Sequence, residues 1–274
     1  MKNNLNLQSI ADEIKLAQDE CKQLSLITER YKSFDNADAY AVAEMVHQMR
    51  LKEGMVPIGR KIGFTNPKMW SIYGVCEPIW GYIYDTTVIK LTEPSAVRCR
   101  IGHFAEPKIE PEVVVHFGSA PSVDANTVEV LASIDWVAHG IEIVQSHFPG
   151  WKFKAADTIA DWGLHATLIV GKPMYVEQLG KNVLNDLENF TVMLSCDGTM
   201  LEQGKGANAL GSPIKAVGHL ITVLAHQPDA TPLQPGELVT TGTLTVALPI
   251  HPGQTWRTSL NGIELSDISI SFEE

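Results

Sequence analysis

The chain has 274 residues, of which 45% are hydrophobic and 19% are charged, so a disordered protein is excluded and one large domain, or a main domain with a smaller attachment, is expected. The formal net charge is -11 and no lysine- or arginine-rich block occurs, which argues against a nucleic acid or an anionic membrane as partner. Four scattered cysteines, no apolar signal-type N-terminus and no run of about 20 apolar residues together predict a cytoplasmic protein with reduced thiols.

Residues 1–55 are expected to form an N-terminal helical segment, and residues 56–274 a catalytic domain. An apolar stripe with helical spacing is formed by Val42, Met45, Val46 and Met49. Asp35 or Asn36 can cap this helix, and Gly54 can end it. A less regular helix is expected over about residues 10–24. We expect these helices to act as a lid or an oligomer contact, without chemistry of their own.

The next two segments contain candidate charged groups. Lys61 lies between Gly59 and Gly63 in a short predicted strand, where glycines allow close approach of another group. Its ammonium can point into a pocket, or it can be an edge-strand lysine that blocks aggregation. Glu77 is held extended by the proline that follows it, so it can be a positioned acid or a turn residue.

Two predicted strands carry three glutamates. Glu110 and Glu112 begin an apolar strand over residues 109–115, and alternation places both on one face, roughly 7 Å apart. Glu142 lies within a second apolar strand over residues 141–144. Buried carboxylates that repel one another are stabilised by a cation, and hard cations such as Mg²⁺ or Mn²⁺ prefer oxygen ligands. The alternative is a strand end with solvated glutamates.

The middle of the chain adds further predicted elements. Residues 127–138 are expected to form a helix with Val130, Ile134 and Val137 on one face. Lys154 and Asp157 are spaced to share one face of a helical turn, where they can orient a substrate carboxylate or form a surface ion pair. A strand is expected over residues 164–170.

The C-terminal part reads mainly as strands. Strands are expected over residues 190–196, 238–245 and 268–272, with Asp197 and Gly198 as a hairpin turn. A glycine-rich loop over residues 204–213 leads into a helix, for which Ser212 can be the N-cap and Pro213 the first position. The expected buried stripe of this helix is Ile214, Val217, Ile221 and Leu224, and its N-terminus can hold an anion. The loop matches neither the P-loop nor the dinucleotide fingerprint. These elements together define the α+β class.

Several motifs occur together in one order along the chain: Gly59-Arg60-Lys61-Ile62-Gly63, Gly74-Val75-Cys76-Glu77-Pro78, Glu110-x-Glu112, Ile141-Glu142-Ile143, Ala156-Asp157-Thr158-Ile159-Ala160-Asp161, the glycine-rich loop from Gly204 to Gly211, and Thr241-Gly242-Thr243-Leu244-Thr245. This ordered set resembles the fumarylacetoacetate hydrolase superfamily, and in particular its branch of 2-keto-4-pentenoate hydratases and 4-oxalocrotonate decarboxylases. The resemblance covers roughly residues 55–274.

The resemblance implies a mixed β-roll or barrel core, a bound Mg²⁺ or Mn²⁺ ion and a homo-oligomer, with a pathway enzyme as a further partner. It implies metal ligation by Glu110, Glu112 and Glu142, and catalytic roles for Lys61, Glu77 and Asp157. The residues expected to bind substrate are Lys154, Asp161, Trp162, His165, Gly206, Asn208, Thr243 and Thr245.

One stretch departs from the family pattern. After the Ala-Asp motif, relatives of this branch continue with asparagine, small residues and serine, whereas this chain has Trp162 and His165. We expect the indole to wall the substrate pocket and to alter specificity.

The expected function is that of a metal-dependent lyase that acts on a small unsaturated 2-keto or 2-hydroxydienoic acid of aromatic catabolism, with a hydratase preferred. A decarboxylase or carbon–carbon hydrolase on the same scaffold is one alternative, and a non-catalytic ligand-binding relative is another. A second cationic or hydroxyl-rich subsite would favour the decarboxylase, and loss of the metal site would favour the binding protein.

Overall fold

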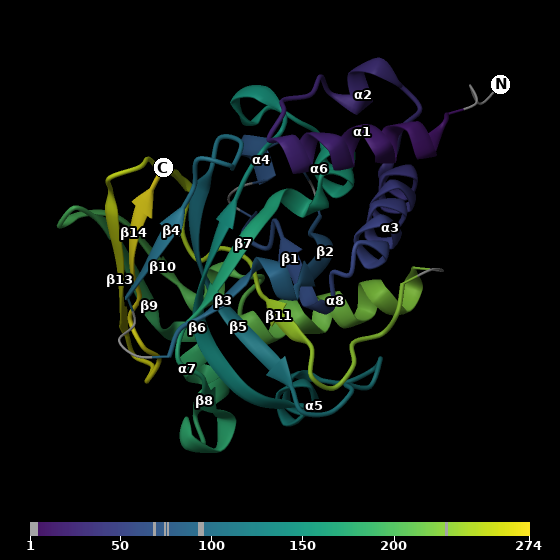
Figure 1. Cartoon of the computed structure of the whole chain (residues 1–274). Helices are drawn as coiled ribbons and strands as arrows, with labels where there is room; N and C mark the ends of the chain where they lie inside the picture. Colours follow the sequence, from purple (N-terminus) through teal and green to yellow (C-terminus); the bar gives the residue numbers. More distant parts are fainter. Residues whose placement is uncertain (1–4, 68–69, 74, 76, 93–95, 228–229) are drawn as a thin grey trace.

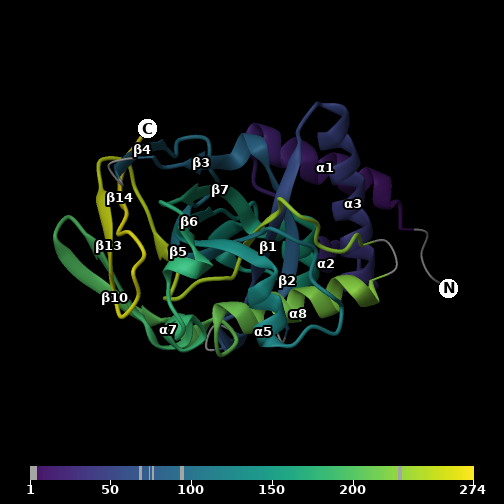
Figure 2. The same cartoon turned by 90° about the horizontal axis from the view of Figure 1, so that it is seen from below.

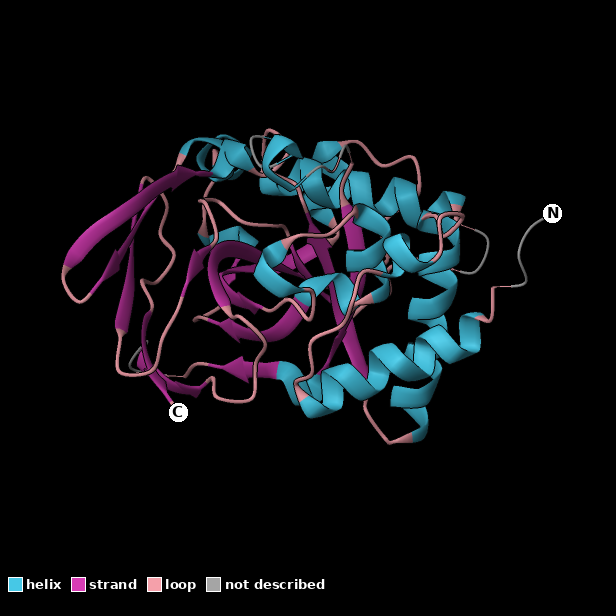
Figure 3. Ribbon diagram, turned by 90° about the horizontal axis from the view of Figure 1, so that it is seen from above, coloured by secondary structure: helices cyan, strands magenta, loops and turns pink. Residues whose placement is uncertain are grey.

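The centre of the molecule is a mixed sheet that curls into a half-barrel, seen from above in Figure 3. The computed structural model describes residues 5–67, 70–73, 75, 77–92, 96–227 and 230–274. The strands of the curled sheet follow the order β2 (Ile79–Tyr84), β1 (Pro57–Gly63), β11 (Leu238–Thr240), β5 (Lys108–Phe117), β6 (Ile134–Val144), β7 (His165–Val170) and β3 (Val88–Lys90). Two short strands extend it: β12 (Leu248–Pro249) pairs with β5, and β8 (Met174–Tyr175) pairs with β6.

A second, smaller sheet lies at one end of the molecule (Figures 1 and 2). Its strand order is β10 (Thr199–Lys205), β9 (Thr191–Cys196), β13 (Thr255–Asn261), β14 (Ser269–Glu273) and β4 (Ala96–Arg100). Asp197 and Gly198 have positive φ angles of 48° and 83°, as a tight hairpin turn requires, so the predicted turn is confirmed. The small sheet packs Trp256, Ile270 and Phe272 against the outer face of the half-barrel, which contributes Ile109, Ile141 and Ile169.

One long helix, α8 (Pro213–His226), runs along the curled sheet. Ser212 caps it by accepting from the Lys215 backbone N–H at 3.2 Å, and Pro213 occupies its first turn, both as predicted. Its buried stripe is Ile214, Val217, Leu220, Ile221 and Leu224, and these side chains join the core cluster of β5, β6 and β11. Helices α5 (Thr127–Ala132) and α7 (Val183–Asn189) border the same cluster.

The N-terminal helices cover the end of the molecule opposite the small sheet (Figure 1). They are α1 (Leu7–Glu20), α2 (Ile27–Arg30) and α3 (Asn36–Lys52); α2 and α3 pack on α6 (Ala155–Ala160), and α1 packs on α3. Asp35 caps α3 in a capping box with Asp38, as the sequence predicts. The helices share one core cluster with Ile79, Val144 and Leu164 of the sheet region, so the N-terminal segment is packed into the rest of the chain.

The remaining elements are short. They are α4 (Trp70–Tyr73) and the 3-10 turns η2 (Asp85–Thr87), η3 (Pro149–Trp151), η4 (Trp162–Leu164), η5 (Val176–Gln178) and η6 (Gly206–Asn208). Within the described residues, no helix has the length and apolar character needed to cross a bilayer.

The α+β class and the curled sheet are confirmed, but three predicted boundaries are wrong. The first helix spans residues 7–20 and ends at Cys21, which has a left-handed φ of 52°. The helix predicted over residues 127–138 ends at Ala132, because from Ile134 onward the chain pairs with β5. The strand predicted over residues 238–245 ends at Thr240, because Gly242, with φ of 89°, turns the chain away.

Candidate functional site

Three carboxylates converge on the inner, concave face of the half-barrel. Strands β5 and β6 pair antiparallel in a register that sets Glu110 directly opposite Glu142 and Glu112 opposite Gly140. One oxygen from each of the three glutamates lies within 4.8 Å of the others. Glu112 and Glu142 are fully buried, and Glu110 is half-buried. Alternation along β5 therefore predicts the pair correctly, and the strand register adds the third carboxylate.

Two of these carboxylate oxygens have no hydrogen-bond partner. Glu112 accepts from the Gly242 backbone N–H at 2.8 Å through Oε2, which leaves its Oε1 buried and unpaired. Glu142 receives Lys61 Nζ at 3.1 Å and His165 Nδ1 at 2.7 Å on Oε1, which leaves its Oε2 buried and unpaired. Unsatisfied buried carboxylate oxygens are costly, and oxygen-only ligands suit a hard divalent cation. The donor set therefore fits Mg²⁺ or Mn²⁺.

The electrostatics of the three carboxylates differ sharply. Loss of hydration raises the pKa of Glu110 to about 7, although Lys61 opposes the shift. Burial, together with Glu142 and Glu110, raises the pKa of Glu112 well above its ordinary range. Burial also opposes ionisation of Glu142, but Lys61 and His165 outweigh it and hold the pKa of Glu142 at about 2. Clustered, desolvated carboxylates of this kind are characteristic of a site completed by a cation.

Lys61 enters the site from β1, and its side chain runs beside Gly63 and Gly163. Its side chain is 3% exposed, and its Nζ reaches Glu142. A Cβ atom placed on Gly63 would lie 3.6 Å from Lys61 Cε, and one placed on Gly163 would lie 3.4 Å from Cδ. Burial lowers the pKa of Lys61, but the three glutamates more than offset it, so its pKa is raised and the ammonium stays charged.

A loop after β11 closes one side of the site. Gly242 donates its N–H to Glu112, and any side chain there would collide with the Thr65 hydroxyl, so only glycine fits. Asn208 Nδ2 donates to the Leu244 carbonyl at 2.7 Å, and Gly204 packs directly on the same carbonyl. The glycine-rich segment thus holds the loop in place.

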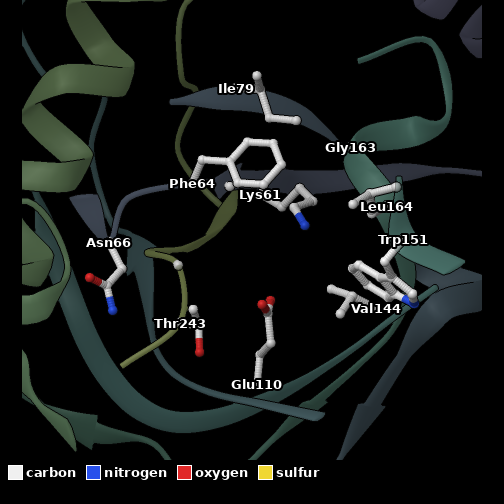
Figure 4. A pocket seen from close by; sticks show the side chains of 12 residues that line it. Lys61, Phe64, Asn66, Ile79, Glu110, Val144, Trp151, Gly163, Leu164 and Thr243 are labelled. Carbon is white, nitrogen blue, oxygen red and sulfur yellow. The ribbon is translucent and has the colours of Figure 1, made fainter. Parts of the chain in front are cut away.

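The space in front of Glu110 encloses about 30 Å³. In Figure 4 the Glu110 carboxylate points toward the Lys61 amine, with Phe64 and Ile79 on one side of the space. Of the residues expected to bind substrate, Thr243 lines this cavity. The lining residues that sequence reasoning missed are Phe64, Asn66, Ile79, Val144, Trp151 and Leu164. They are ordinary apolar or loop residues without a recognisable signal; Asn66, the polar one among them, lies in the loop after β1 and is buried.

Two expected site residues face a different cavity. Glu77 is exposed and accepts from Asn36 Nδ2 at 2.9 Å, and Trp162 donates its indole N–H to the Tyr82 carbonyl at 2.7 Å. Both line a hollow of about 640 Å³ between α3 and β2, which we call the α3–β2 cavity. Within the described residues, Trp162 and Glu77 therefore line this cavity and not the one at the glutamates. The adjoining Gly74 and Cys76 of the same motif lie outside the described residues.

Other expected residues serve the packing of α6. Asp157 is fully buried and accepts from the Thr28 N–H and hydroxyl at 3.0 and 2.8 Å, as well as from the Lys154 N–H. Asp161 contacts the His147 ring at 2.9 Å. Through these contacts the two carboxylates join α6 to α2 and to the segment after β6, away from the glutamates. The Lys154 side chain is exposed. Catalytic or substrate-binding roles for these residues therefore find no support in their positions.

Gly206 and Thr245 also differ from the expectation. Gly206 is buried against the Leu187 carbonyl, and the Thr245 hydroxyl donates to the Val246 carbonyl at 3.1 Å. With Asn208 they shape the loop that carries Thr243, and none of the three lines the cavity. His165, in contrast, does reach the site through its contact with Glu142.

The class of protein is an α+β enzyme built on a half-barrel. Three inward-facing glutamates and a buried lysine give it the ligand set of a divalent-metal site. Residues 80–266 match the family model described as fumarylacetoacetate (FAA) hydrolase C-terminal. The chain belongs to this family.

Named relatives agree in length and fold. The chain is 28% identical over 236 residues to 4-oxalocrotonate decarboxylase from Pseudomonas sp, covering 86% of this chain and 87% of the relative. It is 25% identical over 276 residues to 2-keto-4-pentenoate hydratase from Paraburkholderia phymatum, covering both in full. The structure of 4-oxalocrotonate decarboxylase from Pseudomonas putida G7, complexed with magnesium and adipate, superposes with a TM-score of 0.88 at 24% identity, covering 99% of each chain.

Proposed function

We propose that this chain is a divalent-metal-dependent lyase that acts on a small unsaturated 2-keto or 2-hydroxydienoic acid, most simply as a hydratase of the 2-keto-4-pentenoate type. The observation that carries the proposal is the pair of buried, unpaired oxygens on Glu112 and Glu142 beside Glu110. These three residues are the proposed ligands of Mg²⁺ or Mn²⁺. Bound there, the ion would supply Lewis-acid polarisation of the substrate's carboxylate and keto oxygens.

The chain's own groups supply charge and shape. Lys61 Nζ remains an ammonium, so it acts as a fixed positive charge for the enolate-like oxygen that develops on the substrate, and not as a base. Asn66 and Thr243 line the cavity and offer polar groups to the substrate's oxygens. Phe64, together with the other apolar wall residues, excludes water from the charged centre, which strengthens each of these interactions.

The cavity wall favours the hydratase over the decarboxylase. A decarboxylase acting on a dicarboxylate needs a second cationic or hydroxyl-rich subsite for the distal carboxylate. Among the lining residues that the structure describes, Lys61 is the only cation, and Phe64, Ile79, Val144, Leu164 and Trp151 make much of the rest of the wall apolar. An uncharged unsaturated tail fits these surfaces better than a second carboxylate does.

The test supplies Mg²⁺ with 2-hydroxypenta-2,4-dienoate and, separately, 2-oxohex-3-enedioate, and follows the loss of ultraviolet absorbance. We expect turnover of the first and little of the second. Preferential turnover of the dicarboxylate would overturn the hydratase assignment. Metal binding without turnover of either would point to a non-catalytic ligand-binding relative.

One observation favours the decarboxylase as the second candidate. Lys108 places its Nζ 3.9 Å from the centre of the Trp151 ring, and Trp151 is part of the cavity wall. A rotation of that indole would bring a second cation toward the substrate's far end. In that case Lys108→Met would lower kcat/KM for the dicarboxylate selectively, whereas the hydratase proposal expects no selective loss.

Three wider expectations are kept as proposals. The chain is proposed to form a homo-oligomer that works with a pathway enzyme, in the cytoplasm. The division into a helical segment over residues 1–55 and a catalytic domain over residues 56–274 is proposed on function, since the three N-terminal helices carry none of the groups at the glutamate site. Size-exclusion chromatography with light scattering tests the oligomer.

A further inference from the structure

His165 reaches Glu142 through an irregularity in β7. Along β7, Leu168 lies on the inner face with Val114, and Ile169 on the outer face. Alternation would then turn Ala166 inward and His165 outward. The pairing with β6 instead skips one residue, from Ile143 opposite Thr167 to Val144 opposite His165. This bulge turns Ala166 into the outer cluster and His165 toward Glu142.

The backbone just before His165 is strained. Trp162, Gly163 and Leu164 all have left-handed φ angles, of 56°, 59° and 66°. Two of the three are not glycine, and left-handed φ angles are unfavourable for such residues, so surrounding contacts must hold the turn. Trp162 supplies one through its indole N–H on the Tyr82 carbonyl, and the Leu164 N–H supplies another on the Asp161 carbonyl at 2.8 Å.

The imidazole itself is fixed at both nitrogens. Nδ1 lies 2.7 Å from Glu142 Oε1, which as a carboxylate oxygen only accepts, so Nδ1 carries the hydrogen. Nε2 lies 2.9 Å from the Thr87 hydroxyl, whose oxygen is anchored 3.0 Å from the Tyr84 carbonyl. The Trp162 ring packs edge-on against the imidazole, with centroids 5.3 Å apart.

We propose that His165 is a positioning residue that orients Glu142 for the divalent cation, with Thr87 and Trp162 holding His165 in turn. The inference rests on the proposed metal site. His165 and Lys61 together occupy Oε1 of Glu142, so Oε2 is the buried oxygen that is left for the cation. A hydrogen-bonded carboxylate has one orientation available, and the cation then binds without first ordering it.

The test measures Mn²⁺ affinity by calorimetry on the full chain, without any turnover assay. His165→Leu keeps the volume and removes both hydrogen bonds, and we expect its Mn²⁺ affinity to fall roughly 10- to 100-fold, the range for residues that support a metal ligand. His165→Asn keeps an N–H close to the place of Nδ1, and we expect it to stay within about 3-fold of wild type. Thr87→Val removes only the outer contact, and we expect a loss between these two.

His116 provides a matched control, because it forms another histidine–carboxylate pair, 2.7 Å from Asp135 and stacked on Trp136. His116→Leu should leave Mn²⁺ affinity unchanged. Equal affinity in wild type, His165→Leu and Thr87→Val would overturn the positioning role and show that Lys61 alone orients Glu142. Equal losses in the Leu and Asn variants would also overturn it, since the retained N–H would then have no effect. If wild type itself binds no Mn²⁺, the proposed function fails, which is a distinct result.

Discussion

The α3–β2 cavity and the cavity at the glutamates differ in size and in chemistry. The α3–β2 cavity holds about 640 Å³ and is lined by aromatic side chains such as Tyr82, Tyr84 and Trp162. The cavity at the glutamates encloses about 30 Å³, yet it brings together carboxylates, a buried lysine and two unpaired oxygens. Volume alone would select the α3–β2 cavity. Convergence of charged groups that the fold leaves unsatisfied is the better guide to chemistry.

The first test of the difference between the two cavities neutralises one carboxylate in each of them. Glu112→Gln keeps the shape and the acceptor for Gly242 but removes a buried charge from the proposed ligand set. We expect Mn²⁺ affinity to fall by more than about 100-fold, beyond the range for residues that only support a ligand, without unfolding. Calorimetry measures the affinity, and circular dichroism checks the fold. Glu77→Gln, in the α3–β2 cavity, should change neither.

The cations can be compared in the same way. Lys61→Met should lower kcat by at least about 10²-fold, because one preorganised electrostatic donor contributes on that scale. Arg50, which lines the α3–β2 cavity and pairs with Asp19 at 2.6 Å, serves as the control. Arg50→Gln should lower stability but leave kcat near wild type. Near-normal turnover in Lys61→Met would leave that lysine with a structural role only.

The third prediction concerns the wall of the larger cavity. Trp162→Leu removes an indole that contacts Tyr84 and hydrogen-bonds to Tyr82, so we expect the free energy of unfolding in urea to fall by about 2 kcal/mol. The order of kcat/KM across a panel of 2-keto acids should stay the same, because the indole does not line the glutamate cavity. A changed order of substrates would show that the two cavities act as one.

The smallest effect concerns His47, whose ring stacks on Tyr82 with centroids 3.7 Å apart. Burial, aided by Arg60, lowers the pKa of His47 to about 4. Between pH 4 and 6.5, His47 is therefore protonated in the unfolded chain but neutral in the folded chain. The free energy of unfolding is unaffected by this difference above pH 6.5 and decreases as the pH falls below it. Between pH 7.5 and pH 5, we expect the free energy of unfolding of wild type to fall by roughly 1–2 kcal/mol more than that of His47→Leu, as measured by urea unfolding. Parallel curves for the two proteins would contradict it.

The sequence by itself determined the features that depend on local periodicity. Alternation along β5 placed Glu110 and Glu112 on one face, and helical spacing defined the stripe of α8. The Ser212 cap and the Asp197–Gly198 turn followed from the chemistry of single residues. Each of these is set by neighbours within a few positions, and so each was predicted correctly.

Only the tertiary structure decided how distant segments meet. The β5–β6 register brought Glu142 opposite Glu110, and the bulge in β7 turned His165 inward. The left-handed turn before it directs Trp162 to the α3–β2 cavity and away from the glutamate cavity. Register, bulges and strained turns are fixed by the sum of contacts across the sheet, since one residue of slippage exchanges the two faces of a strand, and no short window of sequence contains that information.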